Sequence, residues 1–461
     1  MKIDMIFGPP GTGKSTRLLD ILNKELETVA PDQIAYVSFT KEGANIGKTR
    51  AKQRFGLTDE DFPFFRTLHS LAFNELNMRR TSMMAPSHYK HFSHKMGMSF
   101  VGYYTEEFTN NDDRYLFFDS LHRNNPRTAA QYASTINTDK LAHVRRNYRR
   151  YKDTFALYDF TDLIELFIKR NKSIPVRVAF IDEAQDLTTL QWTMVWIAFK
   201  DCERIYIAGD DDQAIYQWSG ADVDYFLDIQ YTNLEVLRHS YRLPDPVLRF
   251  AKKITAKIGK RQEKDYEGLG ETGIVTWNND VSELTINPNE TYMFLSRNNV
   301  YLKKIEEMLM KQHVVYSYKG EVSVQMRDIK AIQLYEKVRK TRLMTYDDEF
   351  NLKRYLKEEY SLLNPWYESF NWEEPRMSYM RDIIAYRTDI TTCNINVNTI
   401  HGVKGGEADN VVMLLDVTKN VHDNMAKNPD SEHRVFYVGA TRARKALHLI
   451  NANGRYSYKV V

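Results

Sequence analysis

The chain has 461 residues, a hydrophobic fraction of 43%, a charged fraction of 27% and a formal net charge of +3. This length allows about two to four domains with sizeable cores, and the small net charge neither proves nor excludes a nucleic-acid partner. Only two cysteines occur, Cys202 and Cys393, which excludes a disulfide framework and a cysteine-based metal site. The sequence opens on no signal peptide and contains no apolar run long enough for a membrane helix, so we expect an intracellular protein without a membrane partner.

Short apolar runs alternate with helical patterns along the chain, which is typical of parallel α/β sheets. The strands predicted in the first part are Ile3–Phe7, Ile34–Phe39, Val176–Ile181 and Arg204–Ala208. Those predicted in the second part are Gly273–Trp277, Tyr292–Leu295, Val314–Tyr318, Asn394–Thr399, Val411–Leu415 and Ala446–Ile450. Two polar, mostly helical stretches, 74–157 and 321–392, interrupt this alternation. We interpret each stretch as an insertion into an α/β domain.

A glycine-rich segment follows the first predicted strand and precedes a predicted helix, Lys14 to about Leu26. It reads Gly8, Pro9, Pro10, Gly11, Thr12, Gly13, Lys14, Ser15. This is the G-x-x-x-x-G-K-[ST] spacing, whose backbone N–H groups cradle phosphates at a helix N-terminus. We expect Lys14 to reach the β- and γ-phosphates and the Ser15 hydroxyl to ligate Mg²⁺. The alternative is an ordinary Gly-Pro turn.

A buried strand then runs into acids at Asp182 and Glu183. An aspartate in this place can hold Mg²⁺ through water, and the adjacent glutamate can take the proton of an attacking water. The alternative is an acidic helix N-terminus, which the helix dipole favours by itself.

Three consecutive aspartates, Asp210 to Asp212, follow the next predicted strand and need a nearby cation or basic partner. Gln213 can hydrogen-bond a γ-phosphate, and Trp218 just beyond it can stack on a base. A solvated acidic turn with a tryptophan in the core is the alternative.

These segments and others resemble, in order, the motifs of the UvrD/Rep/PcrA family of superfamily 1 DNA helicases, the 3′-to-5′ branch. The matching segments are Gly8–Ser15, Ser38–Lys41, Thr67–Ala72, Tyr158–Leu163, Asp182–Asp186, Gly209–Ala221, Ser240–Arg242, Ser296–Asn299, Asn398–Glu407 and Arg434–Ala443. The resemblance implies an α/β fold of two RecA-like P-loop domains with parallel sheets, each with a mainly helical insertion. It implies a first domain at 1–73 and 158–235, a second at 236–320 and 393–461, and insertions at 74–157 and 321–392.

The resemblance also implies the roles of individual residues. Arg242 and Arg442 would be arginine fingers on the γ-phosphate beside the catalytic Glu183 and Gln213. Tyr241 would stack on adenine, and Glu407 would bind the ribose. The residues expected to contact DNA are Phe39, Thr40, Thr67, His69, Trp218, Thr399 and His401.

The sequence departs from the family in several places. We find no upstream segment with a glutamine that reads adenine, which puts the preference for ATP over other triphosphates in doubt. Ser219 stands where the family often has arginine. The second insertion is short, and the chain ends soon after the last motif, so we expect no appended nuclease domain. This compact form resembles helicases of phages, and we expect it in the cytoplasm of a bacterium or of a phage-infected host cell.

The sequence thus predicts an ATP- and Mg²⁺-dependent helicase that moves 3′-to-5′ on single-stranded DNA and separates duplex DNA at junctions. We expect a monomer, with replication or recombination proteins as candidate partners. Two alternatives remain: a translocase that displaces proteins from single strands without unwinding, and a DNA-binding scaffold with a decayed ATPase. A P-loop kinase is disfavoured because it would not need the arginine motifs of a second α/β domain.

Overall fold

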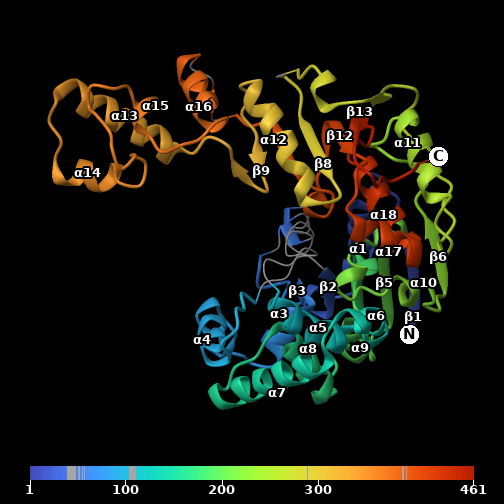
Figure 1. Ribbon diagram of the computed structural model, residues 1–461. Helices are drawn as coiled ribbons and strands as arrows, with labels where there is room; N and C mark the ends of the chain where they lie inside the picture. The colour runs from blue at the N-terminus through green and yellow to red at the C-terminus, as the bar shows by residue number, and fades with distance from the viewer. Residues whose placement is uncertain are drawn as a thin grey trace. The chain divides into compact units, whose positions relative to one another are not determined.

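The computed structural model describes residues 1–38, 48–49, 52–53, 56, 58–102, 111–287, 289–386, 389–390 and 392–460. The chain forms two compact units. The first comprises Met1–Arg242 and Ile258–Gly268, and the second comprises Leu243–Lys257 and Leu269–Val461. Each unit contains its own, mostly parallel sheet, so the predicted α/β class with two parallel sheets is confirmed (Figure 1).

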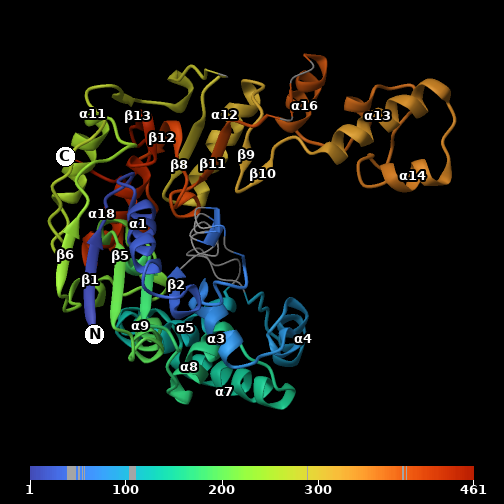
Figure 2. The ribbon, with the colours of Figure 1, turned by 180° about the vertical axis from the view of Figure 1, so that it is seen from behind.

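The sheet of the first unit has six parallel strands in the order β3-β2-β4-β5-β1-β6. The strands are β1 Lys2–Phe7, β2 Ile34–Ser38, β3 Phe65–Thr67, β4 Val178–Asp182, β5 Arg204–Gly209 and β6 Asn233–Val236. Figure 2 shows β6, β1 and β5 side by side. Because all the strands are parallel, the segments that follow them meet at one edge of the sheet, the carboxyl edge.

Both faces of the central strands β2, β4 and β5 are buried, which explains why these strands are mostly continuous apolar runs. On one face, alternate residues such as Met5, Ile181 and Ile207 pack with helices into a large core. On the other face, Ile6 and Phe180 pack under the helix that follows β1. The helices around the sheet are α1 Lys14–Leu26, α3 Leu68–Glu75, α8 Phe160–Arg170, α9 Thr189–Ala198 and α10 Val223–Leu227.

The first helical stretch has a core of its own within the first unit. Its helices are α4 Pro86–Met96, α5 Asp113–Asn124, α6 Pro126–Tyr132 and α7 Thr138–Phe155. Phe92, Tyr115 and Tyr148 are buried in this core, and Trp218 from the chain beyond β5 packs against it. The stretch is therefore anchored to the segment that follows the acidic turn.

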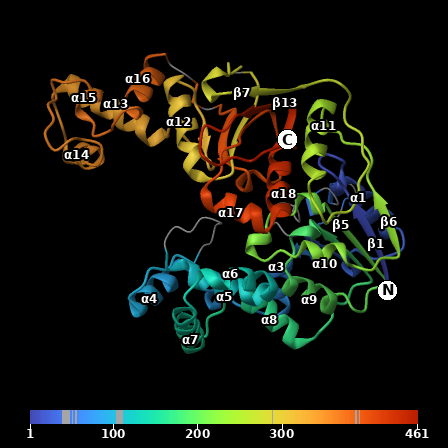
Figure 3. The same cartoon turned by 45° about the vertical axis from the view of Figure 1, so that its right-hand side comes forward.

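The sheet of the second unit has the order β10-β9-β11-β8-β12-β13-β7. Its strands are β7 Ile274–Asn278, β8 Tyr292–Ser296, β9 Ser317–Tyr318, β10 Glu321–Val322, β11 Ile395–Thr399, β12 Ala408–Leu414 and β13 Ala443–Ile450. Only the β9–β10 pair is antiparallel among the described strands. The helices that accompany this sheet are α11 Asp245–Thr255, α12 Leu302–Lys311, α17 Lys419–Lys427 and α18 Pro429–Ala440, and α11 packs on α18 (Figure 3).

A second helical cluster follows β10. It contains α13 Met326–Thr341, α14 Tyr346–Leu352, α15 Trp366–Ser369 and α16 Arg376–Ala385. Tyr335, Trp366, Phe370 and Met380 are buried in its own core. None of the described helices combines the length and the hydropathy that a membrane span requires.

Most of the predicted strands occur, with small shifts at their ends. The exception is the strand expected at Val314–Tyr318, which shrinks to Ser317–Tyr318. Just before it, His313 has a positive φ of 55°, so the backbone there turns instead of extending. Two strands of the first sheet, β3 and β6, were not predicted, because they are short and only partly apolar. The domain boundaries stay a prediction; Tyr241 and Arg242, which the resemblance gives to the second domain, lie in the first unit.

Candidate nucleotide and DNA site

The phosphate loop connects β1 to α1 at the carboxyl edge of the first sheet. Gly11 and Gly13 have φ of 74° and 79°, which ordinary residues seldom adopt. A Cβ added to Gly8 would lie 1.9 Å from Cγ of Lys14. Gly13, the N-cap residue of α1, has no side chain that could accept a hydrogen bond from the first-turn N–H groups. These groups and the helix dipole suit a phosphate.

Lys14 lies inside this loop. Its Nζ donates to the Gly8 carbonyl at 3.2 Å and lies 3.6 Å from Oε1 of Glu183. Burial lowers the pKa of the Lys14 ammonium, but the carboxylates of Glu183, Asp210 and Asp182 outweigh burial and leave this pKa raised. Lys14 is therefore a stable positive charge beside the loop.

Asp182 ends β4 and is only 3% exposed. Its carboxylate accepts a hydrogen bond from the Tyr36 hydroxyl at 2.7 Å and from the Glu183 N–H at 2.9 Å. Burial and the negative charge of Glu183 raise the pKa of Asp182 to about 6. A buried carboxylate of this kind gains from a nearby cation, and with the Ser15 hydroxyl it offers the oxygen ligands that Mg²⁺ prefers.

Glu183 is held in an unusual backbone conformation. Its φ of 52° and ψ of 41° lie in the left-handed region, where non-glycine residues are uncommon. Its carboxylate is fixed between the Lys14 ammonium and Nε2 of Gln185, which donates to Oε2 at 2.6 Å. Strained backbone at a polar site is typical of functional positions.

Gln185 connects the ends of β4 and β5. The Gln185 side-chain amide is fully buried. Its Nε2 donates a hydrogen bond to Glu183, and its Oε1 accepts one from the Asp210 N–H at 3.0 Å. The Asp210 carboxylate in turn accepts a hydrogen bond from Nε2 of Gln213 at 2.6 Å. A continuous chain of hydrogen bonds therefore joins Glu183 to Gln213. Sequence reasoning missed Gln185, although its polarity within a buried stretch could have marked it.

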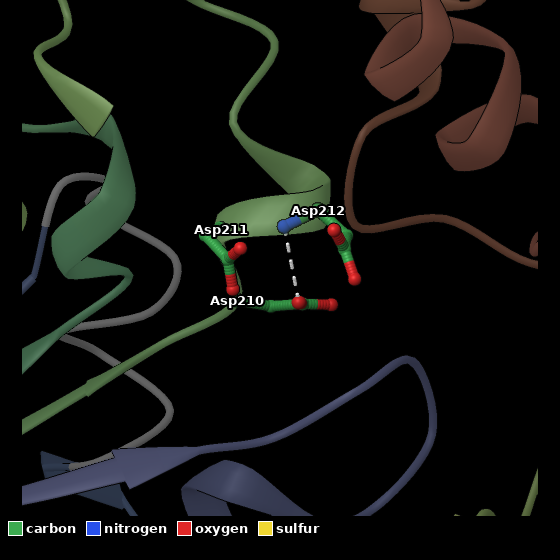
Figure 4. A group of neighbouring side chains, drawn as sticks. All are labelled: Asp210, Asp211 and Asp212. Atoms are coloured by element: carbon green, nitrogen blue, oxygen red, sulfur yellow. Dashed lines mark hydrogen bonds between the residues drawn. The ribbon is translucent and has the colours of Figure 1, made fainter. Parts of the chain in front are cut away.

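The acidic turn after β5 is buried, and its three carboxylates lie close together (Figure 4). The side chain of Lys264 is fully buried and its Nζ lies 3.0 Å from Asp210 and 2.9 Å from Asp212, and it also contacts Asp211. Arg261 donates two hydrogen bonds to Asp212, at 2.8 and 2.6 Å. Of the two compensations that the sequence left open, the structure therefore supplies the basic partner.

The segment Ser240–Arg242 lies on the phosphate loop. The Ser240 hydroxyl donates to the Pro10 carbonyl at 2.7 Å, and the Tyr241 N–H donates to the Gly11 carbonyl at 2.8 Å. The Tyr241 ring is 71% exposed and meets His239 edge-on. The ring is thus exposed beside the phosphate loop, and its stacking on adenine stays a prediction.

The DNA-contact residues predicted in the first unit differ in their surroundings. Thr67 caps α3 by accepting the Ser70 N–H at 3.3 Å. His69 meets the exposed ring of Phe160 edge-on, and burial lowers the pKa of His69 to about 4. The partly buried Trp218 ring stacks on Phe117, with centroids 5.9 Å apart.

Two further residues of this set, Phe39 and Thr40, lie outside the described residues. For Trp218 the packing alternative has a visible partner, whereas a DNA contact of this ring stays a prediction.

The predicted residues of the second unit lie at two opposite edges of its sheet. Thr399 ends β11 at the carboxyl edge and accepts the Gly402 N–H at 3.2 Å, next to His401. Glu407 and Arg442 directly precede β12 and β13, where Ala408 pairs with Ala443 at the amino edge.

Arg442 is only 2% exposed, and its guanidinium donates to the carbonyls of Val438 and Gly406 at 3.0 and 3.2 Å. Glu407 is exposed and lies 3.4 Å from Arg444.

Two protein-family models match this chain. Residues 3–233, half of the chain, match the model of the UvrD/REP helicase N-terminal domain. Residues 394–450 match that of the UvrD-like helicase C-terminal domain. Among solved structures, an arterivirus nonstructural protein 10 helicase is 11% identical over 98% of this chain and 60% of that chain, with a TM-score of 0.39.

Curated relatives are named ATP-dependent DNA helicases. Rep of Salmonella typhimurium is 25% identical over 66% of this chain and 51% of its own length. Rep of Buchnera aphidicola subsp. Schizaphis graminum is 21% identical over 99% of this chain and 93% of its own length. PcrA of Staphylococcus epidermidis is 24% identical over 50% of this chain and 35% of its own length. The chain thus spans about half the length of the first of these relatives, and it belongs to the UvrD/REP helicase family.

Proposed function

We propose that this protein is an ATP-dependent DNA helicase that moves 3′-to-5′ along single-stranded DNA and separates duplex DNA. The observation that carries the proposal lies at one edge of one sheet: Lys14 forms an ion pair with Glu183, and hydrogen bonds lead from Glu183 through Gln185 and Asp210 to Gln213. A phosphate loop joined to two acids and a glutamine can bind a nucleoside triphosphate and cleave it. The helicases named among the relatives support DNA as the second substrate.

In this proposal the first unit holds the triphosphate. The loop N–H groups and Lys14 bind the phosphates, and Ser15 and Asp182 hold Mg²⁺. The ion, when bound, would neutralise charge on the phosphate oxygens. Glu183 accepts the proton of the attacking water, and its contacts with Lys14 and Gln185 keep its carboxylate in one orientation. Gln213 senses the γ-phosphate from the end of the same network.

Four further residues complete the nucleotide site in this proposal. Tyr241 stacks on the base from its exposed place beside Gly11. Arg242 and Arg442 stabilise the charge that develops on the γ-phosphate, and Glu407 binds the ribose. The backbone carbonyls of Val438 and Gly406 accept hydrogen bonds from the Arg442 guanidinium and help to hold it in one orientation.

Single-stranded DNA would contact the carboxyl edges of both sheets. The proposed contacts are Phe39, Thr40, Thr67, His69, Trp218, Thr399 and His401. Aromatic stacking holds bases of any sequence, which suits a motor that must pass every base. Binding of the strand and of ATP would then be coupled, because each favours the same arrangement of the protein.

Unwinding of tailed duplexes tests the proposal. Duplexes with a 3′ or a 5′ single-stranded tail are incubated with ATP, with GTP or without nucleotide, and ATP hydrolysis is followed with and without DNA. We expect DNA-stimulated hydrolysis and strand separation only from the 3′ tail. Stimulated hydrolysis without strand separation would favour a protein-displacing translocase, and hydrolysis indifferent to DNA would refute the motor.

A further inference from the structure

The segment Ile258–Gly268 belongs to the first unit, although the sequence on both sides of it belongs to the second. It lies beside the chain that reaches the phosphate loop. Glu267 pairs with His239, its N–H donates to the Arg238 carbonyl at 2.9 Å, and its carbonyl accepts the Ser240 N–H at 2.8 Å. We name this segment, Ile258–Gly268, the strap.

Lys264 is the buried cation of the strap. Its side chain has no exposed surface, and its ammonium faces three carboxylates, those of Asp210, Asp211 and Asp212. An ammonium has three N–H donors, so each donor is matched by one carboxylate. Burial lowers the pKa of Lys264, but the three carboxylates outweigh burial and leave it raised. Without this charge, three neighbouring buried carboxylates would repel one another or take up protons.

The strap makes a second set of contacts with the same turn. The Gln262 N–H donates to Asp211 at 2.9 Å, and Arg261 forms its two hydrogen bonds with Asp212. Besides its contact with Lys264, the Asp210 carboxylate accepts a hydrogen bond from Gln213, and the Asp210 N–H donates to Gln185. Gln213 is thus one hydrogen bond from the turn that Lys264 stabilises, and Glu183 is reached from that turn through Gln185.

We propose that Lys264 is a positioning residue of the nucleotide site, which through Asp210 fixes Gln213 and, by way of Gln185, Glu183. The inference rests on the proposed ATPase and goes beyond the family motifs, because the strap lies outside all of them. Lys264 touches neither nucleotide nor metal in this account. It sets how well the site distinguishes a nucleotide that has a γ-phosphate from one that lacks it.

The test compares Lys264→Met with Lys264→Arg and with the control Lys260→Met. Lys260 lies on the same strap, but it pairs with the exposed carboxylates of Asp224 and Asp228. For each variant we would measure kcat with DNA, the stoichiometry of nucleotide binding, and the affinities for ADP and for a non-hydrolysable ATP analogue. Thermal unfolding would report the folded fraction.

We expect Lys264→Met to lose about 10²-fold in kcat, the scale of a small misplacement of reacting groups. It should bind nucleotide at full stoichiometry, with its preference for the ATP analogue over ADP reduced toward equality. Lys264→Arg should recover much of the kcat and of the preference for the ATP analogue, since a guanidinium also binds carboxylates. Lys260→Met should behave like the wild type. Normal kcat and normal preference in Lys264→Met would overturn the proposal. So would a lowered unfolding temperature with an unchanged preference, because the role would then be structural only.

If Lys264→Met does not fold, the double variant Asp211→Asn with Lys264→Met keeps the test, because it removes one of the repelling carboxylates. The same two deficits are expected there, and wild-type values would overturn the proposal. If the wild type itself lacks DNA-stimulated hydrolysis, the proposed function fails. The preference for the ATP analogue over ADP would still decide the role of Lys264.

Discussion

The two sheets carry their motif residues in different ways. In the first sheet the phosphate loop follows β1, Asp182 ends β4 and Asp210 follows β5, all at the carboxyl edge of adjacent strands. In the second sheet Thr399 lies at the carboxyl edge, whereas Arg442 lies at the amino edge, one residue before β13. One sheet gathers its motifs at one edge, and the other separates them onto two.

This difference indicates which chemistry each sheet can supply by itself. Lys14, Glu183, Gln185 and Gln213 of the first edge are linked by charges and hydrogen bonds, so that edge brings together residues that we propose for a triphosphate. The second sheet offers two separate groups, which suits one group for the nucleotide and one for DNA. Two of its buried arginines also differ in the partners described for them. Arg297 forms a double hydrogen bond with Glu432, whereas the hydrogen bonds described for the Arg442 guanidinium go to carbonyls.

Substitution of Glu183 is the strongest test of the idea that the first sheet carries the chemistry. We expect Glu183→Gln to keep nucleotide binding but to lose about 10²–10⁴-fold in ATP turnover, because the attacking water loses its base. Turnover and binding of a fluorescent nucleotide would be measured on the same preparation, with Glu203→Gln as control. Glu203 lies on the same unit, in an exposed pair with Arg177. Near-wild-type turnover in Glu183→Gln would show that the chemistry does not centre on the first edge.

Arg442 tests the amino edge of the second sheet. We expect Arg442→Ala to reduce turnover with DNA by up to about 10³-fold, the scale of a lost arginine finger, with a smaller change in nucleotide affinity. Because Arg442 is buried, unfolding temperatures must be compared alongside. Arg455→Ala, an exposed arginine of the same unit, is the matched control. Equal turnover in both variants would remove the nucleotide role from this edge.

Trp218 tests whether the proposed DNA surface extends beyond the first edge. If the ring stacks on a base, Trp218→Ala should cost about 1–3 kcal/mol of single-strand binding and reduce unwinding more than basal hydrolysis. Phe117→Ala removes its packing partner and controls for lost stacking between the two rings. The same loss of DNA affinity in both variants would assign Trp218 to packing.

The pKa of Asp182 gives a smaller, pH-dependent effect. Because burial and Glu183 raise this pKa to about 6, a proton competes with Mg²⁺ below pH 6. The Mg²⁺-dependent affinity for nucleotide should therefore fall by up to about tenfold for each pH unit below 6 and level off above it. Titrations from pH 5 to 8 would measure this, and Asp182→Asn should remove the dependence.

The same shift affects stability with the opposite sign. The pKa in the folded state lies above the ordinary value of 3.8. Ionisation of Asp182 therefore lowers the stability of the metal-free protein as pH rises from about 4 to 6. Thermal unfolding across this range, with and without Mg²⁺, would detect it. A metal that restores stability only above pH 6 would agree with Asp182 as its ligand.

The parts of the fold that local sequence determines were predictable. The helix Lys14–Leu26 and the strands around it follow from glycine spacing and continuous apolar runs, and the structure confirms them. The three consecutive aspartates predicted that a cation or a basic side chain must lie close by, because their carboxylates would otherwise repel one another. The sequence could not identify Lys264 as that partner, because nothing in its local pattern differs from a solvated basic segment and the contact spans more than fifty residues. Nor could it place Trp218, whose packing depends on a helix far away in the chain.

The strap has a practical consequence for dissecting this protein. A recombinant fragment that stops at Arg242 would contain every strand of the first sheet and, judged by its strands alone, would pass for a complete ATPase module. It would nevertheless leave the carboxylates of Asp210, Asp211 and Asp212 without the ammonium of Lys264, and we expect it to be poorly soluble. A linker that joins residues 258–268 to Arg242 would restore the Lys264 ammonium beside the three carboxylates. A fragment that reproduces the first unit must therefore contain residues 1–242 and 258–268 and omit the residues between them.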